Sequence, residues 1–203
     1  MYNLTKKEER ILRKLNTPRK IQDFLDKLKI NFEEKGDTVM SPRRVLREKK
    51  CHCIEGAMLA AVALKFQGKK AWLLDFTVTD KDMDHVVALF KENGKFGAIS
   101  KTNHSVLRYR DAVYNSVREL SMSFFHEYFT DDGKKTLRSY SAPVDLIKKF
   151  GWEWITKEED VWEIPEYLVD CKHYKILNKK QIAKLRRADK IVVDASNLTE
   201  YQQ

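Results

Sequence analysis

Residues 53–67 form a stretch that is apolar on nearly every side of a helix. A helix with this pattern is buried on most sides, and Gly68 is a natural stop for it. The sequence therefore predicts a central buried helix that begins at the run Cys51-His52-Cys53. Its apolar residues are Ile54, Ala57, Met58, Leu59, Ala60, Ala61, Val62, Ala63, Leu64 and Phe66.

Three segments after this helix are predicted to be strands of an antiparallel sheet. They cover residues 71–78, 85–91 and 95–102. Asn93-Gly94 lies between the last two segments and is a strong signal for a two-residue hairpin turn. An α+β fold, with the buried helix packed on an antiparallel sheet, follows from this arrangement.

The hairpin turn also predicts which side chains share a face of the sheet. With Glu92 paired to Lys95, counting back places His85 opposite Thr102. Directly opposed residues share a face, so one face would carry His85, Val87, Ser100 and Thr102. Ser100 or Thr102 could then orient the imidazole of His85.

The rest of the chain is predicted to form helices and short strands around this centre. Helices are expected at 5–15, from Thr17-Pro18 onward, at 41–47, 111–129 and 179–188, and strands at 135–141 and 191–193. With 203 residues and no repeat or long linker, the chain is expected to be a single domain, 1–203. We divide it into a basic helical N-terminal segment 1–40, a core of about 40–130 and an aromatic-rich C-terminal part 131–203.

Charge and composition limit the classes of partner and compartment. Most of the net charge of +9 lies in the first 50 residues, but no nucleic-acid motif accompanies it, so nucleic-acid binding is an unfavoured alternative. No run of 18 apolar residues predicts a membrane span, and the first residues lack a signal-peptide core. The odd count of three cysteines favours free thiols, and hence a cytoplasmic protein.

Cys53 and His85 are the candidate nucleophile and base of a thiol site. The positive end of the helix dipole would favour the thiolate of Cys53. Gly56 and Ala57 would let the sheet approach the first helical turn. Each residue also has an ordinary interpretation, as a buried cysteine and a structural histidine. A basic run would add positive charge before the helix: Arg43, Arg44, Arg47, Lys49 and Lys50.

The chain resembles the transglutaminase-like superfamily of papain-like cysteine enzymes, in particular its uncharacterised prokaryotic members. The resemblance covers about 40–130. It rests on the segments 41–46, Cys53-x-Glu55-Gly56-Ala57, 84–87, 97–101, 118–120 and 124–128. It implies a papain-like fold with Cys53 as nucleophile and His85 as general base. Ser100 stands where the family usually has Asp or Asn, and a serine cannot supply the negative charge that stabilises an imidazolium.

The resemblance implies acyl transfer on an amide or peptide bond, without a cofactor. Cys53 would attack the carbonyl carbon, and His85 would protonate the leaving amine. The backbone N–H of Cys53 would stabilise the oxyanion. Water as acceptor would make the protein a hydrolase, and an amine would make it an acyltransferase. The alternative is a catalytically weak or inactive module that binds a partner beside Cys53.

Two metal sites are further alternatives. Cysteine and histidine ligands for zinc are present, but one residue between Cys51 and Cys53 is an unusual spacing. Asp80, Asp82 and Asp84 alternate as in a calcium loop, yet the required glycine and glutamate are missing, so a solvated acidic turn is predicted. The remaining zinc candidates are His52, Cys171 and His173.

Overall fold

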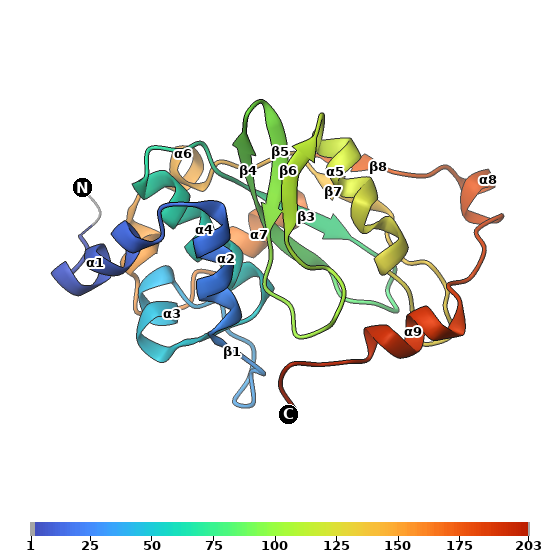
Figure 1. Ribbon diagram of the computed structural model, residues 1–203, viewed down its shortest axis with the longest axis horizontal. Coiled ribbons are helices and arrows are strands. Elements are labelled where there is room, and N and C mark those ends of the chain that lie inside the picture. Colours follow the sequence, from blue (N-terminus) through green and yellow to red (C-terminus); the bar gives the residue numbers. More distant parts are fainter. Residues whose placement is uncertain (1–2, 203) are drawn as a thin grey trace.

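The computed structural model describes residues 3–202 as an α+β fold with helices on both sides of an antiparallel sheet (Figure 1). The predicted class is therefore confirmed. The six-stranded sheet has the order β6-β5-β4-β3-β7-β8, and β1 and β2 form a separate parallel pair. No helix in the described range is long and apolar enough to cross a membrane.

The helices and strands follow one another along the chain in the order below. They are α1 (Lys6–Lys14), α2 (Pro18–Asp26), β1 (Lys29–Ile30), α3 (Pro42–Glu48), β2 (Lys50–Cys51), α4 (Cys53–Phe66), β3 (Trp72–Thr77), β4 (His85–Glu92), β5 (Lys95–Ile99), β6 (Arg110–Tyr114), α5 (Val117–Phe124), the 3₁₀ turn η1 (Phe125–Glu127), β7 (Ser139–Ser141), α6 (Leu146–Phe150), the 3₁₀ turn η2 (Glu153–Thr156), α7 (Glu163–Asp170), β8 (His173–Lys175), α8 (Lys179–Ile182) and α9 (Lys190–Ser196).

Helix α4 is the centre of the larger hydrophobic core, as its sequence predicts. Its residues Ile54–Leu64 are all buried. The N-terminal helices pack against it through residues such as Leu12, Ile21 and Leu25, which are at most 1% exposed. Burial of each of these side chains away from water stabilises the fold by about 1.5–3 kcal/mol. Helices α1 and α2 are thus part of the same core as the predicted central region.

The sheet separates this core from a second one. In β4, Val86, Ala88 and Phe90 pack with α4, whereas Val87 and Leu89 belong to the second core. Helix α5 covers that second side, on the right of the sheet in Figure 1. The alternation along β4 is that of a strand buried on both faces.

The β4–β5 hairpin has the predicted register but a shorter second strand. Glu92 pairs with Lys95, and both Asn93 and Gly94 have positive φ, as a tight hairpin turn requires. The predicted strand 95–102 is too long, because β5 ends at Ile99 and the ladder does not reach Ser100.

The predicted helix 111–129 is wrong in its first part. Arg110–Tyr114 is strand β6, which pairs with β5, and helix α5 begins only after the N-cap Ser116. The exposed residues of β6 alternate along the strand, which shows a period of two rather than a helical one. The strand forms because the edge of β5 is available to pair with it.

The C-terminal predictions are also corrected. The segment 191–193 is helical within α9, with Ile191 and Val192 exposed and Val193 buried. The predicted helix 179–188 ends at Ile182, and the predicted strand 135–141 is reduced to β7 (Ser139–Ser141). The β-branched residues of 191–193 have no strand to pair with, so their β propensity does not decide their structure.

Candidate active site

Cys53 is the first residue of α4, and its side chain is partly exposed. Cys51, two residues earlier, is completely buried, and burial raises the pKa of its thiol to about 12. Gly56 lets the chain after β5 approach the first turn of α4, since a Cβ at this position would lie 2.8 Å from Cβ of Lys101. The small residue at position 56 therefore allows the close approach that the sequence predicts.

His85 lies beside Cys53, and its ring is hydrogen-bonded to Ser100. Nε2 of His85 lies 2.8 Å from Oγ of Ser100, and Ser100 Oγ lies 2.5 Å from the carbonyl oxygen of Leu107. A carbonyl only accepts, so Ser100 donates its single proton to Leu107 and accepts one from His85. This leaves Nδ1 of the His85 ring to serve Cys53, whose side chain is hydrogen-bonded to His85.

Gln22 of α2 holds the backbone of Ser100 in place. Its Oε1 accepts the Ser100 N–H at 2.9 Å, and its Nε2 donates to the Ser100 carbonyl oxygen at 2.7 Å. Gln22 Nε2 also donates to Asp26 at 2.8 Å, which fixes the orientation of the amide. Gln22 thus pairs with both backbone groups of the residue that directly follows β5. Sequence reasoning missed this role, although Gln22 shares the buried side of α2 with Ile21 and Leu25.

His52 is a second histidine at the thiol, which sequence reasoning treated only as a possible zinc ligand. Its Nε2 donates to the Thr38 carbonyl oxygen at 2.9 Å, and its ring is hydrogen-bonded to Cys53. A carboxylate oxygen of Glu55 lies 3.4 Å from Nε2, and one of Glu33 lies 3.5 Å from it. Both distances allow an ion pair when the ring is protonated. Burial lowers the pKa of His52, but Cys53, Glu55 and Thr38 together raise it to about 9.

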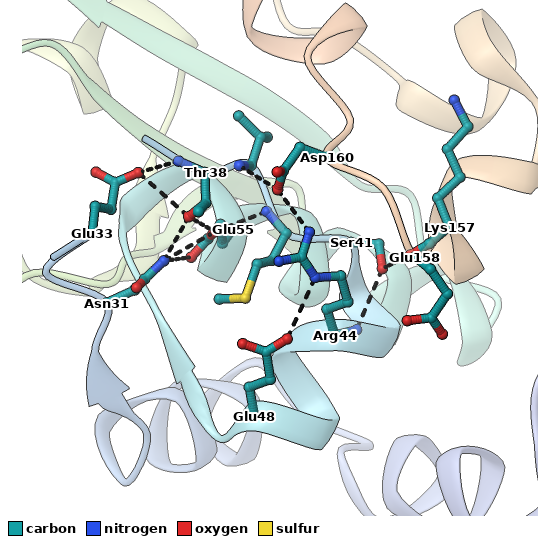
Figure 2. Close-up of polar contacts among 12 residues, drawn as sticks. Asn31, Glu33, Thr38, Ser41, Arg44, Glu48, Glu55, Lys157, Glu158 and Asp160 are labelled. Carbon is teal, nitrogen blue, oxygen red and sulfur yellow. Dashed lines mark hydrogen bonds and ion pairs between the residues drawn. The ribbon is translucent and has the colours of Figure 1, made fainter. Parts of the chain in front are cut away.

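Glu55 connects the start of α4 to the loop before α3 (Figure 2). It is fully buried, and it accepts hydrogen bonds from the backbone N–H of Met40 at 2.8 Å and of His52 at 3.0 Å. Thr38 Oγ1 at 3.1 Å and Asn31 Nδ2 at 3.3 Å also donate hydrogen bonds to the Glu55 carboxylate. Burial raises the pKa of Glu55 against these hydrogen bonds and the charge of His52, which lower it. The three-residue spacing from His52 to Glu55 is a capping-box spacing and could have signalled this contact.

The loop is also held from its other side by ion pairs with the C-terminal part of the chain. Figure 2 shows Arg44 between Asp160, at 2.7 Å, and Glu48, at 3.4 Å. Asp160 also accepts the N–H of Val39, and Ser41 Oγ donates to the Lys157 carbonyl oxygen. The loop that carries Thr38 is therefore fixed at both ends.

The predicted contribution of the basic run to the thiolate is corrected by these pairings. Arg43 pairs with Glu8 at 2.9 Å, Arg44 with Asp160, and Arg47 with Glu158 at 2.6 Å. Acids compensate the charges of these three arginines, and the groups that lower the pKa of Cys53 are His52 and His85.

The electrostatics of Cys53 favour the thiolate. Burial raises the pKa of the thiol, but hydrogen bonds from His52 and His85 and the charges of both rings lower it well below its ordinary value. The direction of this shift favours the thiolate, which is the reactive form of a cysteine side chain.

Several predicted neighbours lie elsewhere. Thr102 accepts the N–H of His104 at 3.1 Å, so Ser100 alone of the two candidates orients His85. Asp84 accepts the N–H of Val78 at 2.8 Å and caps the loop before β4. Within residues 3–202, no group of three or more His, Cys, Asp or Glu side chains is placed to hold a metal ion.

A cavity of about 680 Å³ lies beside the site, without Cys53 or His85 in its wall. Glu33 and Thr38 line it, and both also contact His52. The cavity therefore adjoins the outer side of the second histidine.

Comparison with protein-family models finds no match, and a search of curated proteins finds none either.

Proposed function

We propose that this protein is a cysteine-dependent acyl-transfer enzyme, a hydrolase or an acyltransferase, that acts on an amide or peptide bond. The observation that carries the proposal is the meeting of three groups at Cys53: His52, which directly precedes it, His85 from β4, and Ser100 behind His85. A nucleophile, a base and a group that orients the base form the arrangement of thiol and serine acyl-transfer sites.

We also propose a transglutaminase-like, papain-like fold for the chain. In support, the nucleophile opens a buried helix, the base opens a strand of an antiparallel sheet, and the third residue follows the next strand. The order Cys53, His85, Ser100 is the order of the resembling family.

The mechanism follows from the protons that the geometry assigns. The Cys53 thiolate attacks the carbonyl carbon while Ser100 holds the proton on Nε2 of His85. The backbone N–H of Cys53 donates a hydrogen bond to the oxyanion. This N–H is available because the first backbone N–H groups of a helix have no intrahelical acceptor. His85 then protonates the leaving amine through Nδ1, the C–N bond breaks, and a thioester remains on Cys53.

His52 offers a physical account of how a serine can serve as the third residue. Ser100 supplies no negative charge to an imidazolium on His85. The thiolate is stabilised from the other side as well, by the imidazolium of His52, which Glu55 and Glu33 accompany. The free thiol that this chemistry requires is maintained in a reducing compartment, in agreement with the cytoplasmic location that we infer from the sequence.

Alkylation by iodoacetamide across a pH series tests the proposal. We expect Cys53 to react at pH 6 nearly as fast as at pH 8, whereas an ordinary thiol slows about tenfold for each pH unit below its pKa. The site of modification is read by peptide mass spectrometry, with Cys53→Ser as the control for Cys51 and Cys171. Reaction of Cys53 with the profile of a free cysteine would overturn the proposal.

A catalytically inactive binding module is the second candidate, and the uncharged Ser100 is the observation that favours it. Acylation by p-nitrophenyl acetate separates the two candidates. An enzyme forms an acetyl thioester on Cys53 and releases it again, so p-nitrophenol exceeds one equivalent. A thiolate that is alkylated rapidly but never turns over identifies the binding module.

A further inference from the structure

A second row of polar side chains crosses the sheet beside the site. Asp75 of β3 lies opposite Val86 of β4, and Ser141 of β7 lies opposite His173 of β8. The β3–β7 ladder, which pairs Phe76 with Tyr140, places Asp75 next to Ser141 in the same row. Opposed residues share a face, and Val86 belongs to the core around α4, so the row stands on the face that α4 covers.

The carboxylate of Asp75 in this row is buried, and one of its two oxygens has a hydrogen-bond partner. Asp75 is 4% exposed, and its backbone N–H donates to Oγ of Ser141 at 2.9 Å. Its Oδ2 lies 3.2 Å from Nε2 of His173, whose side chain is 18% exposed. For Oδ1 of Asp75, the described residues provide no hydrogen-bond partner. One carboxylate oxygen is therefore free to accept a proton.

The hydrogen bonds of His173 leave one proton to be shared with Asp75. Nδ1 of His173 lies 2.8 Å from the Cys171 carbonyl oxygen, and a carbonyl only accepts, so Nδ1 carries a proton. The contact between Nε2 and Oδ2 then holds either an imidazolium with a carboxylate or an imidazole with a carboxylic acid. His173, whose side chain is partly exposed, connects this shared proton to solvent.

Asp75 lies in the row of the sheet next to that of His85, because its neighbour Phe76 pairs with His85. By alternation the Asp75 side chain stands on the opposite face from Phe76, which is the face covered by α4, the helix that Cys53 begins. Burial raises the pKa of Asp75 to about 6 against the hydrogen bond from His173, and the charges of Asp84 and Cys53 add to the rise. The carboxylate is thus a base of moderate strength within electrostatic reach of the thiol.

We propose that Asp75, supported by His173, is the base that activates the acyl acceptor in the second half of the reaction. This inference rests on the proposed function. The acceptor, water or an amine, gives a proton to Oδ1 of Asp75 and forms a bond from its oxygen or nitrogen to the thioester carbon. The C–S bond breaks, the electron pair returns to sulfur, and the Cys53 thiolate is again held by His52 and His85.

The division of labour explains why a buried acid is placed beside a thiolate. His85 serves the leaving group, whereas Asp75 serves the acceptor. A buried carboxylate at position 75 costs free energy through its desolvation and through its repulsion by the thiolate, and a neutral side chain would avoid both costs. Buried acids with raised pKa values are typical of functional sites, which supports a role for Asp75 in the reaction.

The test separates the two half-reactions. Wild type and Asp75→Asn are acetylated on Cys53 with p-nitrophenyl acetate, freed of reagent, and followed by intact mass as the acetyl group leaves, in buffer alone and with added n-butylamine. We expect acylation within about threefold of wild type and loss of the acetyl group slower by roughly 10². A slow step in both media assigns Asp75 to either acceptor, and a slow step with the amine alone assigns it to amines.

Three controls keep the test decisive. His173→Gln keeps a hydrogen-bond donor to Asp75 but cannot share its proton, so we expect a smaller slowing of the same step even if Asp75→Asn folds poorly. Asp80→Asn alters an exposed carboxylate of the following loop and should change neither step. Loss of the acetyl group at the wild-type rate, or equal slowing of both steps, would overturn the inference. If the wild type never forms an acetyl thioester, the proposed function itself fails.

Discussion

The two histidines at Cys53 are held in different ways. His85 belongs to the sheet, and its partner Ser100 is neutral and is fixed by backbone and amide groups. His52 belongs to the helix start, and its partners Glu55 and Glu33 are acids. The difference indicates that the sheet side directs a proton, whereas the loop side supplies charge. Variants on each side should therefore affect different steps.

The largest effect is expected from His85→Asn. This change removes the base but leaves His52 to stabilise the thiolate, so acylation by p-nitrophenyl acetate should slow by roughly 10²–10⁴. Alkylation of Cys53 at pH 7 should fall much less, by about tenfold or less. If both rates fall to the same extent, the two histidines do not differ as we describe.

The next largest effect is expected from Gln22→Ala, which should lower the stability of the fold. It leaves the buried N–H and carbonyl groups of Ser100 without partners, which costs about 2–4 kcal/mol of unfolding free energy. Urea denaturation measures this loss. The matched control is Gln67→Ala, which removes one hydrogen bond to the Leu12 carbonyl oxygen and should cost about 1 kcal/mol. Equal losses in the two variants would contradict the role of Gln22.

His52→Asn should act on the charge of the site. Asn keeps a donor for the Thr38 carbonyl oxygen and removes the imidazolium, so the pKa of Cys53 should rise and alkylation at pH 6 should slow by roughly 10–100-fold. The sign follows from the pKa of about 9 for His52: the imidazolium is present below this value and is lost as the pH rises through it. Wild-type acyl transfer should therefore decline above about pH 9.

The control for this charge effect is Lys50→Gln, in the basic run that precedes the helix. Its alkylation profile should match the wild type within about twofold, because the histidines are the cations that contact the thiol. A shift as large as that of His52→Asn would restore the basic run as the source of charge.

The smallest effect is expected from Ser100→Ala. It removes the acceptor of the His85 Nε2 proton, which should slow acylation about tenfold and leave alkylation at pH 6 unchanged. Ser100→Asn can donate to Leu107 and accept from His85 at once, so it should recover part of the lost rate. Recovery by Asn but not by Ala would show that orientation of the ring, and not charge, is the function of Ser100.

The sequence predicted the parts of the site that depend on local pattern. The start of α4, the Asn93-Gly94 turn and the pairing of Glu92 with Lys95 need only nearby residues. The register placed His85 on one face with Ser100 and Thr102, and the family resemblance then singled out Cys53 and Ser100.

Other parts depend on contacts between distant residues and could not be predicted. Gln22 reaches Ser100 across 78 positions, and Asp75 reaches His173 across 98. Strand β6 was taken for a helix because its partner, the edge of β5, is visible only in three dimensions.

The two hydrogen bonds between the Gln22 side chain and the Ser100 backbone affect how the protein would lose activity on heating. Helix α2 carries one side of the site's support through these hydrogen bonds. Local unfolding that detaches α2 would release the Ser100 backbone while α4 and the sheet remain folded. Inactivation would then begin at a lower temperature than the collapse of the sheet, and the lost activity would return on cooling.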